Sequence, residues 1–355
     1  MSLRVYICAA EASGDALAAT LIDRLHLVGD VHARGLTGPR MRESGVDTLE
    51  EGERFGAVGL VEAIPAALDA PRLLRALERD IRRFQPDVLV TVDSPSLLLR
   101  LARRFPDLAR VHWVAPQVWA WRKRRARRVL RDVDTLLCLF PFETAWFTGG
   151  ECRVRCVGHP VVGGGTRTRG DGKVVVLSPG SRKATIRRHL PLYRAVAESV
   201  RRLDDEVEFE VAVAPGVDIA DLEGLPGIRV HSLAESRARV ALSAAGTHTL
   251  HLAMRGVPMV VAHRVHPVSW ALTRPWRGPD LQVALPNLLS GEPLVEEFLQ
   301  RISPERVAMR LCRLLGEEGR TQTLKTQAAL KGLPGAGAAS LAAAEVLRAI
   351  RVKAS

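Results

Sequence analysis

The segment EASGD places acidic side chains, a hydroxyl and a glycine directly after the apolar run RVYICAA (4–10). Ser13 and Gly14 follow an expected strand and open an expected helix, so their backbone N–H groups can face an anion. Asp15 can cap that helix or bind a sugar hydroxyl. From these residues alone, a helix cap and a ligand site both stay open.

The loop SPGSRKA (178–184) stands in the same position, after an apolar run and before a helical pattern. Gly180 permits close backbone approach, Ser181 can donate a hydrogen bond, and Arg182 can grip a phosphate with two N–H groups. The pattern G-x-x-x-x-G-K-[ST] is absent, so this is not a Walker loop. A purely structural turn is the alternative interpretation.

A third turn, AAGTHTLH (244–251), repeats the arrangement with Gly246 and Thr247 between strand and helix. Exposed N–H groups and the helix dipole would attract a diphosphate there. His248 and His251 fall on the first turns of the expected helix. Histidines in such places are more often partly buried and hydrogen-bonded than ligand-binding, so a ligand role for His251 stays open.

Asp93, within TVDSPS, ends an expected strand and precedes Pro95. A carboxylate at this point can deprotonate a sugar hydroxyl, provided that it reaches the proton. Aspartates at strand ends also serve as helix caps, and the residues alone favour neither role.

Two tryptophans, Trp119 and Trp121, precede seven basic residues between Arg122 and Arg131. Aromatic rings beside a dense cationic helix are typical of an interface with anionic lipid. Backbone contacts to nucleic acid and a solvated helix face are the alternatives. No zinc finger, basic zipper or RNA-binding signature accompanies the segment, so we expect a membrane surface and no nucleic-acid partner. The predicted membrane residues are Trp119, Trp121, Arg122, Lys123, Arg124 and Arg125.

The elements that must position these residues alternate between apolar strand-like runs and helical patterns. Such alternation predicts an α/β fold with mainly parallel sheets covered on both faces. In the first half the expected strands are 4–10, 87–93, 111–115, 134–140 and 152–158, and in the second half 173–181, 207–216 and 257–265, with a strand, a glycine turn and a helix together over 239–256. In such sheets, ligands lie outside the carboxyl ends of the strands, where the glycine turns fall.

A glycine-rich stretch without periodicity, 158–173, interrupts the alternation and reads as an interdomain linker. We therefore expect an N-terminal Rossmann-like domain over 1–160 and a C-terminal one over 171–335. We expect a C-terminal helix over residues 336–355.

Size and composition agree with a globular protein of two domains. The chain has 355 residues, 47% hydrophobic and 25% charged, which argues against disorder. Its net charge of +12 favours anionic partners. Five scattered cysteines indicate reduced thiols, and no complete zinc spacing is present. With neither a signal peptide nor an apolar run long enough to span a bilayer, we expect a cytoplasmic protein.

Taken together, these segments resemble the lipid-A-disaccharide synthase family, in order and over nearly the whole chain. The motif around the tryptophans and LPNLL are the most specific. The matching motifs are EASGD (11–15), GPRM (38–41), VGLVEAI (58–64), PDVLVTVDSP (86–95), PQVWAWR (116–122), FPFE (140–143), GHP (158–160), PGSR (179–182), GT (246–247), PMVV (258–261) and LPNLL (285–289).

The resemblance implies a GT-B fold, two Rossmann-like doubly wound domains facing a cleft, and an inverting glycosyl transfer. It also implies that the C-terminal helix packs back on the first domain. The family moves 2,3-diacylglucosamine from UDP to the 6-hydroxyl of 2,3-diacylglucosamine 1-phosphate at the inner face of the cytoplasmic membrane, giving a β-1,6 disaccharide and UDP. By this resemblance Asp93 is the general base, and no metal or cofactor is required. The acceptor side is lined by Ser13, Gly14 and Asp15, and the nucleotide sugar is held by Gly180, Ser181, Arg182, Gly246, Thr247, His251 and Asn287.

Several positions depart from the family pattern, mostly on the nucleotide side. His251 and Thr185 each stand where the family usually has glutamate, and His263 stands where it has tyrosine. Ser96, Leu97 and Leu98 replace the acidic and Phe-Asn residues after the D-x-P motif. The alternatives are therefore a paralogue that uses another nucleotide sugar, including epimerase-like chemistry, and a non-catalytic binder of nucleotide sugar or lipid. A homodimer stays open.

Overall fold

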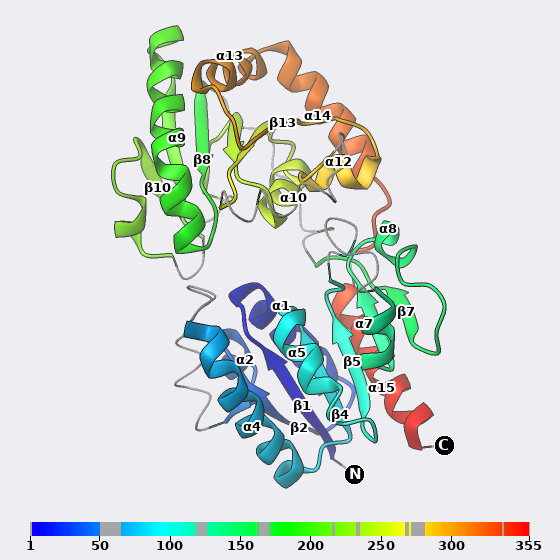
Figure 1. Cartoon of the computed structure of the whole chain (residues 1–355). Coiled ribbons are helices and arrows are strands. Elements are labelled where there is room, and N and C mark those ends of the chain that lie inside the picture. Colours follow the sequence, from blue (N-terminus) through cyan, green and yellow to red (C-terminus); the bar gives the residue numbers. More distant parts are fainter. Residues whose placement is uncertain are drawn as a thin grey trace. The chain divides into compact units, whose positions relative to one another are not determined.

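The computed structural model describes residues 2–49, 65–116, 126–160, 172–214, 217–231, 235–266, 281–335 and 337–354, together with 118, 162, 170 and 270 (Figure 1). They form two compact units, Met1–Gly163 with Leu333–Ser355, and Gly164–Gly332. The predicted membrane residues Trp119, Trp121, Arg122, Lys123, Arg124 and Arg125 lie outside the described residues, as does the motif at 58–64.

The first unit is built on a parallel sheet whose described strands run in the order β3-β2-β1-β4-β5-β6-β7. Its central strands are continuous apolar runs because helices bury both of their faces. All five residues of β4, for example, are buried. The strands are β1 (Leu3–Ala9), β2 (Val31–Leu36), β3 (Asp47–Thr48), β4 (Val88–Val92), β5 (Ala109–Trp113), β6 (Thr135–Cys138) and β7 (Arg153–Cys156).

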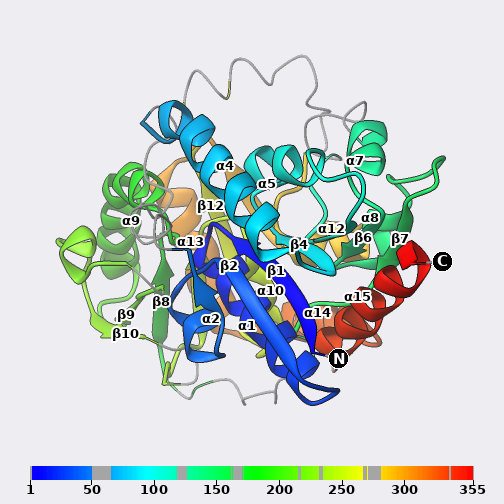
Figure 2. The ribbon, with the colours of Figure 1, turned by 90° about the horizontal axis from the view of Figure 1, so that it is seen from below.

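Helices cover both faces of this sheet (Figure 2). α1 and α15 pack against each other on one face, and α4, α5 and α7 follow one another on the other. The C-terminal helix α15 thus belongs to the first unit, where Arg153 of β7 holds its Glu345 through two bonds of 2.7 and 2.9 Å. The helices are α1 (Ala12–His26), α2 (Pro39–Glu43), α4 (Pro65–Phe84), α5 (Pro95–Ala102), α7 (Ala126–Asp132), α8 (Pro141–Thr144) and α15 (Ala338–Ala354).

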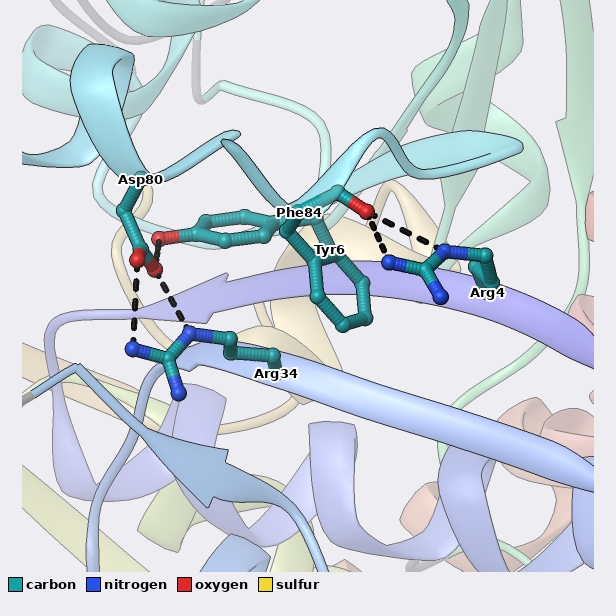
Figure 3. A network of polar contacts seen from close by, with 5 residues as sticks. All are labelled: Arg4, Tyr6, Arg34, Asp80 and Phe84. Atoms are coloured by element: carbon teal, nitrogen blue, oxygen red, sulfur yellow. Dashed lines mark hydrogen bonds and ion pairs between the residues drawn. The ribbon is translucent and has the colours of Figure 1, made fainter. Parts of the chain in front are cut away.

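A buried polar network fastens α4 to the sheet (Figure 3). The Asp80 carboxylate accepts two hydrogen bonds from Arg34 on β2, of 2.9 and 3.1 Å, and one of 2.8 Å from the Tyr6 hydroxyl on β1. Arg4 donates to the carbonyl of Phe84 at the end of the same helix. Burial, with Cys8 and Asp80 nearby, raises the pKa of Tyr6, so the phenol stays a donor.

The second unit repeats the plan with the strand order β10-β9-β8-β11-β12-β13, again all parallel among the described strands. α9 and α13 pack together over one apolar cluster, and α10, α12 and α14 pack together as a second group. The strands are β8 (Val174–Ser178), β9 (Glu208–Ala212), β10 (Ile228–Val230), β11 (Val240–Ser243), β12 (Met259–His263) and β13 (Glu296–Leu299). The helices are α9 (Lys183–Leu203), α10 (Thr247–Met254), α12 (Leu285–Ser290), α13 (Pro304–Leu315) and α14 (Glu317–Leu330), with a 3-10 turn η2 (Ile219–Leu222).

In each sheet the order in which the chain adds strands changes direction at the first strand of the unit. β1 lies between β2 and β4, and β8 lies between β9 and β11. Ligands of doubly wound sheets bind at such a reversal, outside the carboxyl ends of the strands. In the first unit this point lies between the segments EASGD and Asp93, and in the second between PGSR and the turn at Gly246. Among the described residues, no helix is both long and apolar enough to cross a membrane.

Candidate functional site

Asp93 directly follows β4 in a strained backbone conformation. Its φ is +58°, and that of Ser94 is +45°, both in the left-handed region that few residues other than glycine adopt. The Asp93 N–H donates to the Trp113 carbonyl at 2.9 Å, and the Ser94 N–H donates to the Asp93 carboxylate at 2.7 Å. These bonds hold a half-buried carboxylate at the end of the strand.

The first turn of α1 supplies the other side of this site. The Ser13 hydroxyl donates to the Asp93 carboxylate at 3.3 Å, and the Ser94 hydroxyl lies 3.4 Å from the carboxylate of Glu11. A Cβ on Gly14 would lie 3.1 Å from the Val92 carbonyl oxygen, so a glycine permits this close approach of helix to strand. The structure therefore brings Ser13 and Gly14 together with Asp93, and adds a second carboxylate, Glu11.

Asp15 caps the start of α2, whereas the sequence predicted that it could cap α1. It is buried, and its carboxylate accepts hydrogen bonds from the backbone N–H groups of Gly38, Arg40 and Met41 at 3.0, 2.9 and 3.1 Å. It thereby satisfies the open N–H groups at the start of α2. These bonds favour a structural role in holding the GPRM segment beside α1.

In the second unit, two glycine loops lie side by side at the reversal of the sheet. Gly180 has a φ of +119°, and a Cβ added there would lie 3.2 Å from a Thr185 methyl and 3.9 Å from the Cβ of Ala244. Ser181 and Arg182 are exposed where α9 begins, and Gly246 and Thr247 are exposed where α10 begins. Two helix N-termini and an exposed arginine are features that can bind a diphosphate.

His251 lies one turn into α10 and is partly exposed. Burial lowers the pKa of His251, and the positive charge of Arg255 adds to this effect. Burial, assisted by the nearby His251, lowers the pKa of His248 to about 4. The two rings lie 6.3 Å apart. Both are therefore neutral near pH 7, a form in which an imidazole can donate and accept a hydrogen bond with a ribose hydroxyl.

Asn287 of the LPNLL motif is buried inside the second unit. Its side-chain N–H groups donate to the Val295 carbonyl and to Glu297 at 2.8 and 2.7 Å, and its side-chain oxygen accepts from the Val295 N–H at 2.8 Å. Glu297 also accepts from the backbone N–H groups of Val283 and Ala284. Asn287 thus secures the segment beside Gly246, with which Ala284 pairs.

Comparison with known proteins adds to this geometry. The profile of the family described as lipid-A-disaccharide synthetase matches residues 5–333. The chain belongs to the lipid-A-disaccharide synthetase family. Among its relatives, a lipid-A-disaccharide synthase of Alkalilimnicola ehrlichii is 36% identical over 98% of both chains, and one of Granulibacter bethesdensis is 35% identical over 88% of this chain and 86% of that protein.

Solved structures agree on the fold of this family member. The calicheamicin glycosyltransferase CalG4 aligns with a TM-score of 0.61 at 19% identity, covering 98% of each chain. A UDP-GlcNAc 2-epimerase from Neisseria meningitidis aligns with a TM-score of 0.60 at 9% identity, covering 98% of this chain and 100% of that one. At these identities the likeness shows the fold alone, the two-domain α/β fold of GT-B glycosyltransferases.

Sequence reasoning missed several polar residues of this synthetase-family chain. Glu11 was read only as part of EASGD, and Ser94 only as a neighbour of Asp93. His189 and Glu297 gave no signal, because a single histidine within a helix or glutamate within a short strand is unremarkable. Among the described residues, no group of three His, Cys, Asp or Glu side chains is placed to hold a metal ion.

Proposed function

We propose that this chain transfers 2,3-diacylglucosamine from UDP to the 6-hydroxyl of 2,3-diacylglucosamine 1-phosphate, forming a β-1,6 disaccharide 1-phosphate and UDP. The family match across residues 5–333 carries the proposal. Relatives of up to 36% identity carry the name lipid-A-disaccharide synthase. They support a glycosyltransferase better than an epimerase or a non-catalytic binding protein.

In this mechanism Asp93 is the general base. Its carboxylate takes the proton of the acceptor 6-hydroxyl while the hydroxyl oxygen attacks C1 of the donor sugar. The bond from C1 to the diphosphate oxygen breaks, UDP leaves with the electron pair, and the configuration at C1 inverts. Ser13, which donates to Asp93, orients the carboxylate, and Glu11 adds a second acceptor for substrate hydroxyls.

The leaving diphosphate is stabilised in the second unit. We assign the loop residues Gly180, Ser181 and Arg182, with Gly246 and Thr247 at the start of α10, to its oxygens. Helix N-termini and an arginine can neutralise the negative charge that develops as the bond breaks. His251 in its neutral form serves the ribose hydroxyls, and Asn287 acts by holding the segment beside Gly246.

The acylated substrates imply work at a membrane surface, and the cationic outer face of the first unit supports this. On α4 the arginines recur along one exposed face, and α5 and α7 continue the charge. The exposed arginines of this face are Arg72, Arg75, Arg79, Arg82, Arg83, Arg100, Arg103, Arg127, Arg128 and Arg131. Each cation near an anionic leaflet contributes about 1 kcal/mol. We propose peripheral binding at the cytoplasmic side through this face and through segment 119–125, which precedes α7 in the sequence.

The test is an assay of the full chain with UDP-2,3-diacylglucosamine and 2,3-diacylglucosamine 1-phosphate in detergent micelles. Mass spectrometry would follow the disaccharide, and a coupled assay would follow UDP. We expect equal amounts of both products, and neither product when one substrate is omitted. UDP without disaccharide would indicate hydrolysis, and absence of both from folded protein would contradict the proposed function.

A further inference from the structure

Behind the two glycine loops, a buried histidine joins parts of the second unit that are distant in sequence. His189, on α9, has no exposed surface. Its Nδ1 lies 2.7 Å from the carbonyl oxygen of Pro179, and its Nε2 accepts a hydrogen bond of 2.9 Å from the Arg264 N–H. Because a carbonyl only accepts and a backbone N–H only donates, His189 must carry its proton on Nδ1 and be neutral.

A second histidine continues the connection. His263 is the last residue of β12, and its Nδ1 accepts a hydrogen bond of 3.3 Å from the Ala245 N–H. The rings of His189 and His263 meet edge to face, with centroids 4.9 Å apart and planes at 69°. We call this pair the histidine bridge. It connects the loop 179–182, the loop 244–247 and the carboxyl end of β12.

The surroundings of the bridge keep both rings neutral. Burial lowers the pKa of His263 to about 4, and the neighbouring His189, Arg188 and Arg182 add to this effect. Burial also lowers the pKa of His189, and Arg188 and Arg264 assist this effect, whereas the hydrogen bond from Nδ1 to the Pro179 carbonyl opposes it. Tyr193 stacks on His189 and stays a neutral phenol because burial raises its pKa. Neither ring hydrogen-bonds a carboxylate among the described residues.

We propose that His189 and His263 are positioning residues that set the spacing of the two diphosphate loops, so that donor binding depends on both rings being neutral. The inference rests on the proposed donor site. Neither ring touches the diphosphate: His189 places the loop that carries Arg182, and His263 places the turn that carries Gly246.

Acid should open the bridge. A proton on Nε2 of His189 would face the Arg264 N–H, and a proton on Nδ1 of His263 would face the Ala245 N–H, with arginines nearby. In the folded protein each ring stays neutral until the pH approaches its depressed pKa, which for His263 is about 4, so the bridge is complete at pH 7 and is lost as the pH falls toward these values. Affinity for the donor should fall in this window.

The decisive experiment compares His189→Asn with His189→Gln in the full chain, with UDP as the probe in calorimetry at pH 7.5. The asparagine amide can reach the position of Nδ1 and keep the bond to Pro179, and the glutamine amide can reach that of Nε2 and keep the bond to Arg264. Each variant loses one connection, so we expect UDP to bind about three- to tenfold more weakly in each. His112→Asn, which alters a buried histidine of the first unit, should leave UDP affinity unchanged.

The pH profile of UDP binding supplies the second readout. Between pH 7 and pH 4 the wild-type affinity should decrease, whereas His263→Tyr, which removes one titrating ring, should show a smaller decrease. Wild-type affinity in both His189 variants, or an identical pH profile in His263→Tyr, would overturn the histidine bridge alone. Absence of UDP binding by the wild-type chain would instead overturn the donor site on which the inference rests.

Discussion

At the scale of single residues, backbone strain collects where β4 and β5 end. Asp93 and Ser94 follow β4, and Val114 follows β5 with a φ of +77°. Left-handed backbone costs roughly 1–2 kcal/mol per residue, and for a β-branched side chain it is a true outlier. Such strain persists only where the surrounding structure imposes it, and it collects at functional sites. Its place beside Ser13 and Glu11 agrees with Asp93 as the base.

The substitution Asp93→Asn tests the role of the carboxylate in the reaction without disturbing the left-handed backbone at this position. Asparagine tolerates left-handed backbone as aspartate does, so the variant should fold with an unchanged melting temperature. Without a carboxylate to take the acceptor proton, kcat should fall by about 10²–10⁴-fold with little change in KM. Initial rates of disaccharide formation measure this, with Ser13→Ala as a milder comparison. More than a tenth of wild-type kcat in Asp93→Asn would exclude this base.

At the scale of elements, the short helix α8 carries a buried carboxyl group. Glu143 is 3% exposed, and its carboxylate accepts from the backbone N–H groups of Leu139 and Phe140 at 2.8 and 3.0 Å. Burial raises its pKa to about 7 against these bonds. The folded state therefore binds a proton that the unfolded state releases, so this group lowers stability as the pH rises from about 4.5 to 7.

Glu143→Gln should remove that pH dependence, because glutamine keeps an acceptor oxygen for both N–H groups and does not titrate. Relative to wild type, the variant should gain stability between pH 5 and pH 8, by at most roughly 3 kcal/mol. Thermal melts of both proteins at several pH values measure the difference. Parallel curves of melting temperature against pH would show that Glu143 does not titrate in this range.

The strands buried on both faces were predictable because a parallel sheet leaves a continuous apolar run, as in β4 and β8. The short outer strands β3, β10 and β13 and the polar β2 lack such runs and were missed. The positions of Ser13 and Asp93 at strand ends followed from the alternation. Their meeting, the cap that Asp15 forms on α2, and the bridge through His189 depend on strand order, which local patterns do not specify.

At the scale of the whole molecule, the C-terminal segment Leu333–Ser355 belongs to the first unit, and we expect α15 to be necessary for the stability of that unit. Ala342 has no exposed surface, whereas the adjacent Leu341 is 50% exposed. Ala342→Arg buries an unpaired charge, and we expect it to destabilise the first unit by several kcal/mol. Leu341→Arg adds the same side chain facing solvent and should cost little. Equal melting temperatures for the two variants would contradict the packing of α15 described above.

The net charge of +12 should act chiefly through the cationic face of α4. Binding to vesicles that contain anionic phosphatidylglycerol should weaken with salt, since the screening length falls from about 10 Å at 0.1 M to about 3 Å at 1 M. Changing Arg72, Arg75 and Arg79 to glutamate should reduce binding strongly. The same change at the exposed Arg201, Arg202 and Arg313 of the second unit is the matched control. Equal losses in both triple variants would indicate a nonspecific charge effect.

The most direct test of the central claim is the NMR structure of the linkage in the reaction product. If Asp93 activates the 6-hydroxyl for attack on C1 of an α-linked UDP donor, the new bond inverts the anomeric centre. We predict a β anomeric coupling and a through-bond correlation from C1 of the transferred sugar to C6 of the acceptor. An α linkage, attachment at another hydroxyl, or no disaccharide would contradict the account.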